Sequence, residues 1–218
     1  MTQTPLAVDL DGTLILTDTL HESAVRALRA RPLSVLQIPF WLAQGKAALK
    51  QRLSALTDFD AAALPYNEPL LEWLRAEHAQ GRKLILCTAA DTSMAHAVAE
   101  HTGIFDEVMA SDGHHNLSAE NKGAALEARF GRGGFDYAGN SSADLPVWQR
   151  ARRAIVVNAS ASVEQQARAV SEVERVFAVD SVGLSDISRV LRLHQWTKNL
   201  LLRCVPNQTA RWSSAVNW

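Results

Sequence analysis

The sequence predicts an α/β fold in which a parallel sheet carries helices on both faces. Short apolar, β-branched runs alternate with helical patterns as far as about residue 180, and this alternation is typical of a mostly parallel sheet. One interval, residues 17–66, contains only helical patterns and interrupts the alternation. We therefore expect a small helical cap inserted after the first strand, placed where it could fold over the strand ends.

Six apolar runs are the expected strands, and each is short enough to be a buried strand of a parallel sheet. They are 6–8 (LAV), 83–87 (KLILC), 107–111 (EVMAS), 135–139 (FDYAG), 153–158 (RAIVVN) and 174–179 (ERVFAV).

Helix signals lie between these runs. The stretch 67–81 has Pro69 near its start and Gly81 at its end, which are favoured positions for proline and glycine. The stretch 91–103 begins on an aspartate cap and ends on a glycine. These signals divide the chain into a core, a cap and a tail. The expected bounds are 1–16 and 67–180 for the core, 17–66 for the cap and 181–218 for the tail.

Composition excludes several function classes. The 218 residues carry 22 basic and 23 acidic side chains, so no overall field attracts nucleic acid. The first residues lack the basic flank and apolar stretch of a signal peptide. The chain has two cysteines, Cys87 and Cys204, far apart in sequence, and we expect a reducing, cytoplasmic setting with no disulfide framework.

Polar residues mark the ends of several expected strands. Ligands of open parallel sheets bind beyond the carboxyl ends of the strands, so these side chains should face one crevice. A lysine near the start of a helix adds a cation to the set. The residues are Asp9, Asp11, Thr88, Lys122, Asn140 and Asp144.

This arrangement resembles the haloacid dehalogenase (HAD) superfamily of phosphatases, which has a Rossmann-like core. The motif Asp-x-Asp-Gly-Thr-Leu stands at 9–14, and the Thr that follows an apolar strand is Thr88. The expected lysine is Lys122, and the usual Gly-Asp-x-x-x-Asp motif stands at 139–144 with asparagine in its first acidic position. The resemblance extends over residues 5 to about 160.

The two acids of the first motif have separate expected roles. A carboxylate nucleophile at Asp9 would divide phosphate-ester hydrolysis into two easier steps, and Asp11 would move the protons. The resemblance implies the same roles, with Thr88 as hydrogen-bond donor to the phosphoryl group and Lys122 as its countercharge. Substrate-binding positions are expected at Gly12, Thr13, Asp18 and Ala89.

Two carboxylates that face a phosphate need a hard cation, and oxygen ligands suit Mg²⁺. The resemblance implies Asp9, the backbone carbonyl of Asp11, Asn140 and Asp144 as its ligands. Asn140 leaves one negative charge fewer than usual, which bears on metal affinity and leaves a catalytically silent domain as an alternative. Asn140 is equally well explained as a helix cap.

Other polar residues have simpler readings beside the functional ones. Asp9 and Asp11 by themselves would suit a solvated acidic turn, and Asp18 would suit a cap of the first inserted helix. His114 and His115 resemble a metal pair, but no partner stands at ligand spacing, so a solvated loop is expected. Cys87 is expected to be a small buried hydrophobe.

The substrate is suggested by two apolar stretches. Residues 33–43 are apolar on nearly all sides and too short to span a bilayer; they form either the core of the cap or a membrane- or lipid-binding surface. Residues 187–206 resemble the opening of a UbiA-type polyprenyltransferase, although no Asn-Asp-x-x-Asp motif is present. We therefore expect the tail to be the truncated start of such a membrane domain, with no prenyl transfer by this chain.

Prenyltransferases of this kind imply a lipid-linked sugar phosphate as substrate, of the polyprenyl-phosphoryl 5-phosphoribose type. The protein would then lie in the cytoplasm, peripheral to the inner face of the membrane. Alternatives are a small soluble phosphomonoester of the phosphoserine kind, and a non-catalytic module that binds a lipid or a partner.

Overall fold

The computed structural model describes residues 3–18, 59–112, 116–117 and 119–178. Residues 1–178 form one compact unit. Most of the expected cap, the apolar stretch 33–43, the histidines at 114–115 and the tail lie outside the described residues. Of the helices that are described, none is both long and apolar enough to cross a membrane.

The centre of the unit is a six-stranded sheet in which every neighbouring pair of strands is parallel. The strand order is β3-β2-β1-β4-β5-β6, so the chain proceeds outward from β1 first on one side and then on the other. A reversal of this kind leaves a crevice beyond the ends of the central strands. The strands are β1 (Leu6–Val8), β2 (Leu84–Asp91), β3 (Glu107–Ser111), β4 (Asp136–Gly139), β5 (Arg153–Val157) and β6 (Glu172–Phe177).

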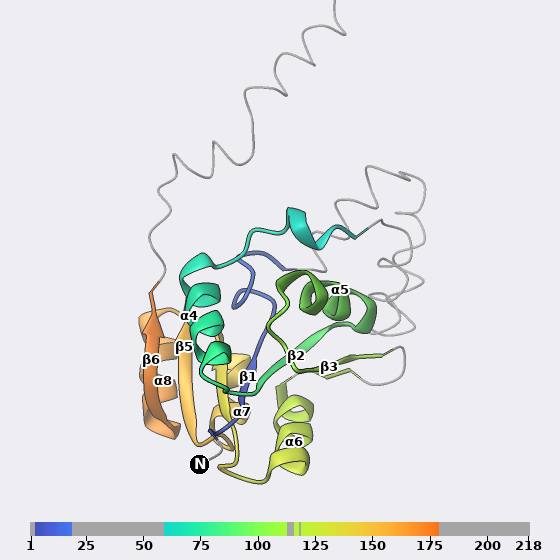
Figure 1. Ribbon diagram of the computed structural model, residues 1–218. Coiled ribbons are helices and arrows are strands. Elements are labelled where there is room, and N and C mark those ends of the chain that lie inside the picture. Colours follow the sequence, from blue (N-terminus) through green and yellow to red (C-terminus); the bar gives the residue numbers. More distant parts are fainter. Residues whose placement is uncertain (1–2, 19–58, 113–115, 118, 179–218) are drawn as a thin grey trace, which may run out of the picture. The chain divides into compact units, whose positions relative to one another are not determined.

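Helices connect the strands and cover both faces of the sheet (Figure 1), which confirms the predicted fold class. The α-helices are α4 (Glu68–Ala79), α5 (Thr92–Thr102), α6 (Ala119–Phe130), α7 (Leu145–Trp148) and α8 (Ala161–Val170). Two short 3-10 helices, η2 (Ala61–Ala63) and η3 (Ser142–Asp144), lie within loops.

Two hydrophobic clusters pack on the opposite faces of the sheet. Leu6 and Val8 of β1 belong to the cluster with α4 and α5, whereas Ala7 belongs to the cluster with α6, α7 and α8. The same alternation occurs along β2, β4 and β5, because successive side chains of a strand point to opposite faces. All three residues of β1 are fully buried, which explains why its sequence is continuously apolar.

The expected helix caps are present with small changes in position. Asn67 caps α4 through its side chain, and Pro69 lies in the first turn. The helix ends at Ala79 with Gln80 as its C-cap, and Gly81 follows with a positive φ of 86°. The side chain of Asp91 accepts a hydrogen bond from Ser93 N and caps α5, which has Gly103 as its C-cap.

Two strand predictions were wrong at their ends. β2 continues to Asp91 rather than ending at Cys87, and its register against β3 shifts between these residues. The irregular pairing joins Asp91 to Ser111, and a shift of this kind leaves no period in the sequence. β6 begins at Glu172 and ends at Phe177; it lies at the sheet edge, where exposed charged residues obscure the apolar pattern.

The two ends of the interval 17–66 meet at the core. Ile15 pairs with Tyr66 in an antiparallel bridge. Leu16 N donates to Pro65 O, and Asn67 N donates to Leu14 O, both at 2.9 Å. We call this pairing of 14–16 with 65–67 the neck of the insertion.

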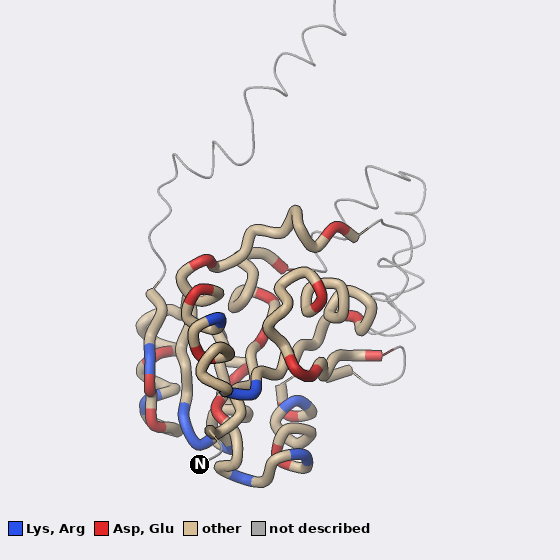
Figure 2. The backbone as a smooth tube through the Cα atoms, in the orientation of Figure 1, with Lys and Arg blue, Asp and Glu red and all other residues tan. Residues whose placement is uncertain are grey.

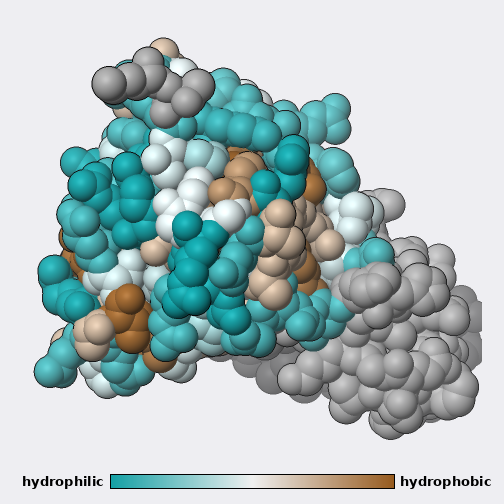
Figure 3. Space-filling model, turned by 90° about the horizontal axis from the view of Figure 1, so that it is seen from below, coloured by the Kyte–Doolittle hydropathy of each residue, from teal (hydrophilic) through white to brown (hydrophobic). Residues whose placement is uncertain are grey.

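The amino-terminal end of the sheet is held by buried charges. Asp136, at the start of β4, is fully buried and accepts hydrogen bonds from Arg82 and from Arg152, whose Nη2 is 2.6 Å away. Figure 2 shows that most of the blue segments lie toward this lower end of the view, whereas the upper end is mainly red and tan. Seen from below, this end is largely hydrophilic, and its brown areas are separated by teal (Figure 3).

Candidate active site

The predicted site residues come from the carboxyl ends of three adjacent strands. Asp9 follows β1, Thr88 lies in the last part of β2, and Asn140 follows β4. β1 pairs with both β2 and β4, so these three strand ends are neighbours. The crevice expected for an open parallel sheet therefore begins at Asp9.

Asp9 and Lys122 form a buried ion pair at these strand ends. Lys122 Nζ lies 2.8 Å from Asp9 Oδ1, and the two residues are 4% and 8% exposed. Lys122 reaches the strand end from the first turns of α6. A charged hydrogen bond of this length in a buried site is strong and holds both groups in one geometry.

Burial and neighbouring charges shift the pKa values of both Asp9 and Lys122. Burial raises the pKa of Asp9 to about 7, and the nearby Asp144 and Asp11 add to this effect against the attraction of Lys122. Burial lowers the pKa of Lys122, but Asp9 and Asp144 attract the ammonium and hold its pKa above the ordinary value. The lysine therefore stays charged at neutral pH, whereas the pKa of Asp9 lies close to neutral pH.

Asp144 closes the loop that follows β4. Its Oδ2 accepts hydrogen bonds from Asn140 N and Ser141 N, both at 3.0 Å, and from Ser141 Oγ at 3.2 Å. Its Oδ1 accepts one from Tyr137 Oη at 2.9 Å. Asp144 thus holds the loop after β4 in place through hydrogen bonds to its backbone and to Tyr137.

Asn140 lies against the turn that follows Asp9. A Cβ atom at Gly12 would lie 2.1 Å from Asn140 Nδ2, and Gly12 has a φ of 71°. Only glycine satisfies both conditions without strain. On the other side of the turn, Asn158 Nδ2 donates to Gly12 O at 3.4 Å.

Two hydroxyl groups in the site are available to a ligand. Thr88 is fully buried, and its Oγ1 accepts a hydrogen bond from Ala90 N at 3.0 Å, so its proton can be donated elsewhere. The Oγ1 atom of Thr13 is buried and has no hydrogen-bond partner among the described residues. Both observations suit the predicted contacts with an anion.

The remaining predicted positions lie around this centre. Asp11 is partly exposed at the turn and makes a bridge to Ile15. Ala89 is partly buried in β2, and Asp18 is exposed at the edge of the described residues. Cys87 is fully buried, and burial raises the pKa of its thiol to about 12, so it fits the predicted role of a small hydrophobe.

Tyr137 and Asn158 were not predicted as site residues, although both contact the site. Tyr137 is fully buried and accepts a hydrogen bond from Lys122 Nζ at 2.9 Å. A tyrosine within an otherwise apolar strand was the available signal, because a buried phenol needs a partner. Asn158 has a positive φ of 48°, which places its amide beside Gly12; the end of the β5 run offered only a weak signal.

The donor set suits a hard cation. Among the described residues, no three His, Cys, Asp or Glu side chains lie close enough to hold a metal ion by themselves. A site here therefore needs the Asn140 amide or a backbone carbonyl beside the carboxylates, as in the predicted set. Oxygen donors of this kind fit Mg²⁺.

Residues 6–149 match the haloacid dehalogenase-like hydrolase family. The chain belongs to this family. The match includes the predicted site residues, from the turn of Asp9 to the loop of Asp144, but ends before Asn158.

The curated proteins include a relative that is longer than this chain. It is 40% identical to this chain over 200 residues, which are 91% of the chain. It is the uncharacterized protein y4nM of Sinorhizobium fredii, and the chain spans 38% of its length.

Solved structures share the fold at low sequence identity. A protein of unknown function from Bordetella pertussis has a TM-score of 0.59 at 17% identity and covers 80% of this chain and 99% of its own. A predicted phosphatase from Clostridium acetobutylicum has a TM-score of 0.58 at 15% identity, with coverage of 86% and 100%. A substrate-bound phosphoserine phosphatase has a TM-score of 0.55 at 17% identity, with coverage of 87% and 99%.

Proposed function

We propose that this hydrolase cleaves phosphomonoesters through an aspartyl-phosphate intermediate on Asp9. The observation that carries the proposal is the buried pair of Asp9 Oδ1 and Lys122 Nζ, 2.8 Å apart, at the carboxyl end of the central strand. The lysine holds the carboxylate in place and supplies positive charge where a phosphate dianion would bind. The exposed side of the same turn carries a second acid, Asp11.

The two steps use the acids differently. An oxygen of Asp9 attacks phosphorus, the ester P–O bond breaks, and Asp11 gives a proton to the leaving oxygen. A water molecule then attacks the phosphorus while Asp11 takes back a proton, and the bond to Asp9 breaks to release phosphate. Thr88 donates its hydroxyl proton to a phosphoryl oxygen, and Lys122 offsets the charge.

Mg²⁺ would be held by Asp9, the backbone carbonyl of Asp11, Asn140 and Asp144. When bound, it neutralises charge on the phosphoryl oxygens and orients them for in-line attack. The turn at 10–13 is closed from within, because Gly12 N donates to Thr17 O and Thr13 N donates to Leu10 O, both at 3.3 Å. The buried hydroxyl of Thr13, which has no hydrogen-bond partner in the part of the chain that the structure describes, belongs to the same turn.

The substrate we propose is a lipid-linked sugar phosphate, of the polyprenyl-phosphoryl 5-phosphoribose type. Its support is in the sequence: the apolar stretch 33–43, suited to a lipid or a membrane surface, and the likeness of 187–206 to the opening of a UbiA-type polyprenyltransferase. This places the protein in the cytoplasm, at the inner face of the membrane, with no nucleic-acid partner. The rival substrate is a small soluble phosphomonoester such as phosphoserine, for which Asp18 would be the recognising acid.

The test is Mg²⁺-dependent release of phosphate from three substrates, namely an aryl phosphate, phosphoserine and the lipid-linked sugar phosphate in detergent. We expect release from the aryl phosphate and fastest release, by kcat/KM, from the lipid-linked substrate. Asp9→Asn should lower the rate by about a thousandfold or more, because an amide is not a nucleophile at phosphorus.

Asp60→Asn is the matched control. Asp60 Oδ1 accepts a hydrogen bond from Ala62 N at the start of η2, and asparagine caps equally well. The control should keep the wild-type rate. A folded wild type that releases no phosphate from any substrate at saturating Mg²⁺ contradicts the enzymatic proposal and favours a binding module. Preference for phosphoserine contradicts only the lipid substrate.

A further inference from the structure

The hydroxyl of Tyr137 lies between the two halves of the site. Lys122 Nζ is 2.9 Å from Tyr137 Oη, and Tyr137 Oη is 2.9 Å from Asp144 Oδ1. With the Asp9 contact, these bonds form one continuous chain from the nucleophile to the loop after β4. Each of the three residues Lys122, Tyr137 and Asp144 is buried.

The direction of this chain is fixed by the chemistry of its members. An ammonium group only donates and an ionised carboxylate only accepts. The phenol must therefore accept from Lys122 and donate its single proton to Asp144. No second arrangement of protons satisfies both contacts, so the chain holds one geometry.

The ring of Tyr137 is fixed as well as its hydroxyl. Trp148 packs edge-on against it, with ring centroids 6.5 Å apart, and Trp148 Nε1 donates to the backbone oxygen of Tyr137 at 3.1 Å. Because the ring cannot swing, its hydroxyl is a fixed point against which both Lys122 and Asp144 are set.

We propose that Tyr137 is a positioning residue that couples Lys122 to the loop of Asp144. The proposal rests on the proposed function of the site. Among the described residues, Asp9 and Tyr137 take two of the three N–H donors of Lys122, which leaves one for a ligand. Asp144 in turn anchors the loop that carries Asn140. The lysine that would contact a phosphoryl group and the loop whose Asn140 would contact a metal are thereby tied to one fixed hydroxyl.

Tyr137 does not act as an acid or base in this arrangement. Burial raises its pKa well above the ordinary value, and the charges of Asp144 and Asp9 raise it further. The phenol proton is donated to Asp144 Oδ1, and the contribution of Tyr137 is geometric.

The first test replaces the hydroxyl and keeps the ring. Tyr137→Phe should remain folded by circular dichroism and lower kcat for an aryl phosphate by roughly 10- to 100-fold, as expected for misplaced groups. In a Lys122→Met background the same change should have less than about a twofold effect, because the group being positioned is already missing. Tyr66→Phe is the matched control, since that hydroxyl bonds to Ala61 O.

The second test reads the position of the hydroxyl without activity. The chain has two tyrosines, so Tyr66→Phe protein grown with meta-fluorotyrosine carries one fluorine signal, that of Tyr137. Mg²⁺ with orthovanadate, a phosphoryl mimic, should shift this signal. The shift should be lost in the same protein with Lys122→Met.

The outcomes separate the two proposals. Wild-type protein that neither releases phosphate nor binds vanadate overturns the proposed function, and the role of Tyr137 with it. An active wild type whose folded Tyr137→Phe variant keeps its kcat within about twofold overturns the role of Tyr137 alone. Equal losses in both backgrounds would show a general packing effect and overturn it too. If Tyr137→Phe does not fold, the fluorine experiment decides. A signal of Tyr137 that does not change when the Tyr66→Phe protein binds vanadate overturns the role of Tyr137.

Discussion

Asp9 and Lys122 are 113 residues apart in the sequence, yet their charged groups meet at 2.8 Å beneath the surface. The contact requires β1 and α6 to be in place, so it reports on the assembled core. It also confines a negative and a positive charge where water has little access. Removal of either partner leaves the other buried and unpaired, which is costly.

Lys122→Met should therefore affect stability as well as activity. We expect the free energy of unfolding to fall by about 3 kcal/mol at neutral pH, because the carboxylate of Asp9 loses its cation. The loss should shrink in acid, where Asp9 takes up a proton. Urea unfolding at several pH values, without metal, measures this. A small loss of unfolding free energy that does not depend on pH would show that the pair of Asp9 and Lys122 contributes little to stability.

Metal binding should release a proton from the site. The pKa of Asp9 is raised to about 7 from its ordinary 3.8, so the folded protein holds a proton there that the unfolded chain has lost. The contribution of Asp9 to stability therefore falls as pH rises between these values. A cation displaces this proton, so Mg²⁺ affinity should increase by at most about tenfold per pH unit up to about pH 7 and then level off.

Calorimetric titration with Mg²⁺ in buffers of different ionisation enthalpy measures the proton release directly. Below about pH 7 the apparent enthalpy should depend on the buffer, and well above it the dependence should vanish. An affinity that stays constant across this range would contradict the placement of Mg²⁺ beside Asp9.

Asn140→Asp should raise the affinity for Mg²⁺ and lower the stability of the metal-free protein. The new carboxylate keeps the shape of the amide against Gly12 but adds a negative charge near Asp9 and Asp144. We expect Mg²⁺ to bind about tenfold more tightly and the metal-free protein to unfold more easily, because only a cation offsets the repulsion. Asn140→Ala, which removes the ligand oxygen, should weaken binding instead. Equal affinities for the three proteins would remove Asn140 from the metal site.

Asp136→Asn should destabilise the protein and spare the chemistry. Asp136 is fully buried and pairs with Arg82 and Arg152 at the opposite end of the sheet from the site. Loss of its charge should lower the free energy of unfolding by about 3–5 kcal/mol, as for other buried pairs that lose one partner. The rate per folded molecule should remain that of the wild type.

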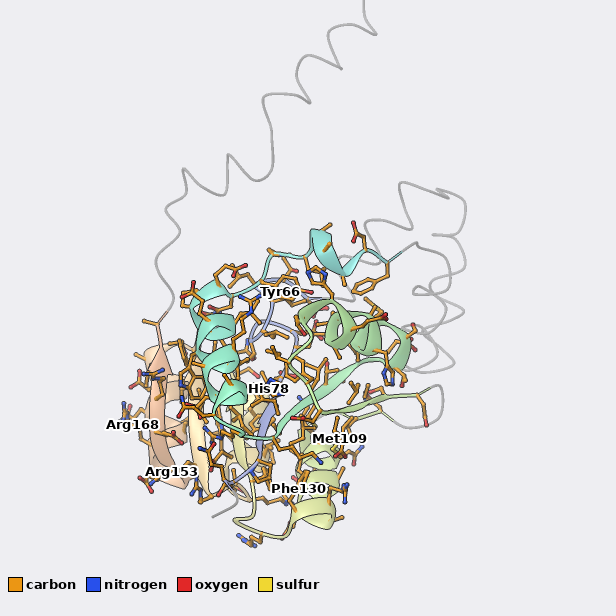
Figure 4. The ribbon with its side chains drawn as sticks, viewed as in Figure 1. Tyr66, His78, Met109, Phe130, Arg153 and Arg168 are labelled. Carbon is orange, nitrogen blue, oxygen red and sulfur yellow. The ribbon has the colours of Figure 1, made fainter. Side chains whose placement is uncertain are left out.

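Glu172→Gln is the control for this change. Glu172 pairs with Arg153 at 3.3 Å, but its side chain is 68% exposed. An exposed pair contributes less than about 1 kcal/mol, so this variant should melt close to the wild type. Arg153 and Arg168 lie toward the outer edge of the sheet, near β6 (Figure 4), where solvent screens such pairs. Similar losses for both variants would show that burial at Asp136 adds nothing.

The sequence was most informative where a structural feature depends on a single strand and the residues that follow it. The apolar run at 6–8 and the acids after it predicted both the central strand and the turn of Asp9, because burial on two faces forces a continuous apolar pattern. The motif order also predicted that Thr88, Lys122 and Asn140 converge, since parallel strands end at one edge.

The sequence was least informative where partners come from distant segments. Tyr137 reads as an ordinary strand residue until α6 brings Lys122 to its hydroxyl. Arg82 and Asp136 lie 54 residues apart, and their pairing follows from strand order rather than from any local period. The extension of β2 to Asp91 depends on a register shift against β3, which neither strand shows by itself.

The neck between 14–16 and 65–67 makes the insertion a replaceable module. The chain leaves and re-enters the core at paired neighbours, since Leu16 and Pro65 are joined at 2.9 Å. A loop closed at its base can change in length or content at small entropic cost to the rest of the fold. Chimeras that exchange residues 19–58 for other segments, and so retain Ala61 and Leu64 of the core cluster, should therefore keep the same core, and the choice of substrate could diverge among relatives while the reacting groups stay in place.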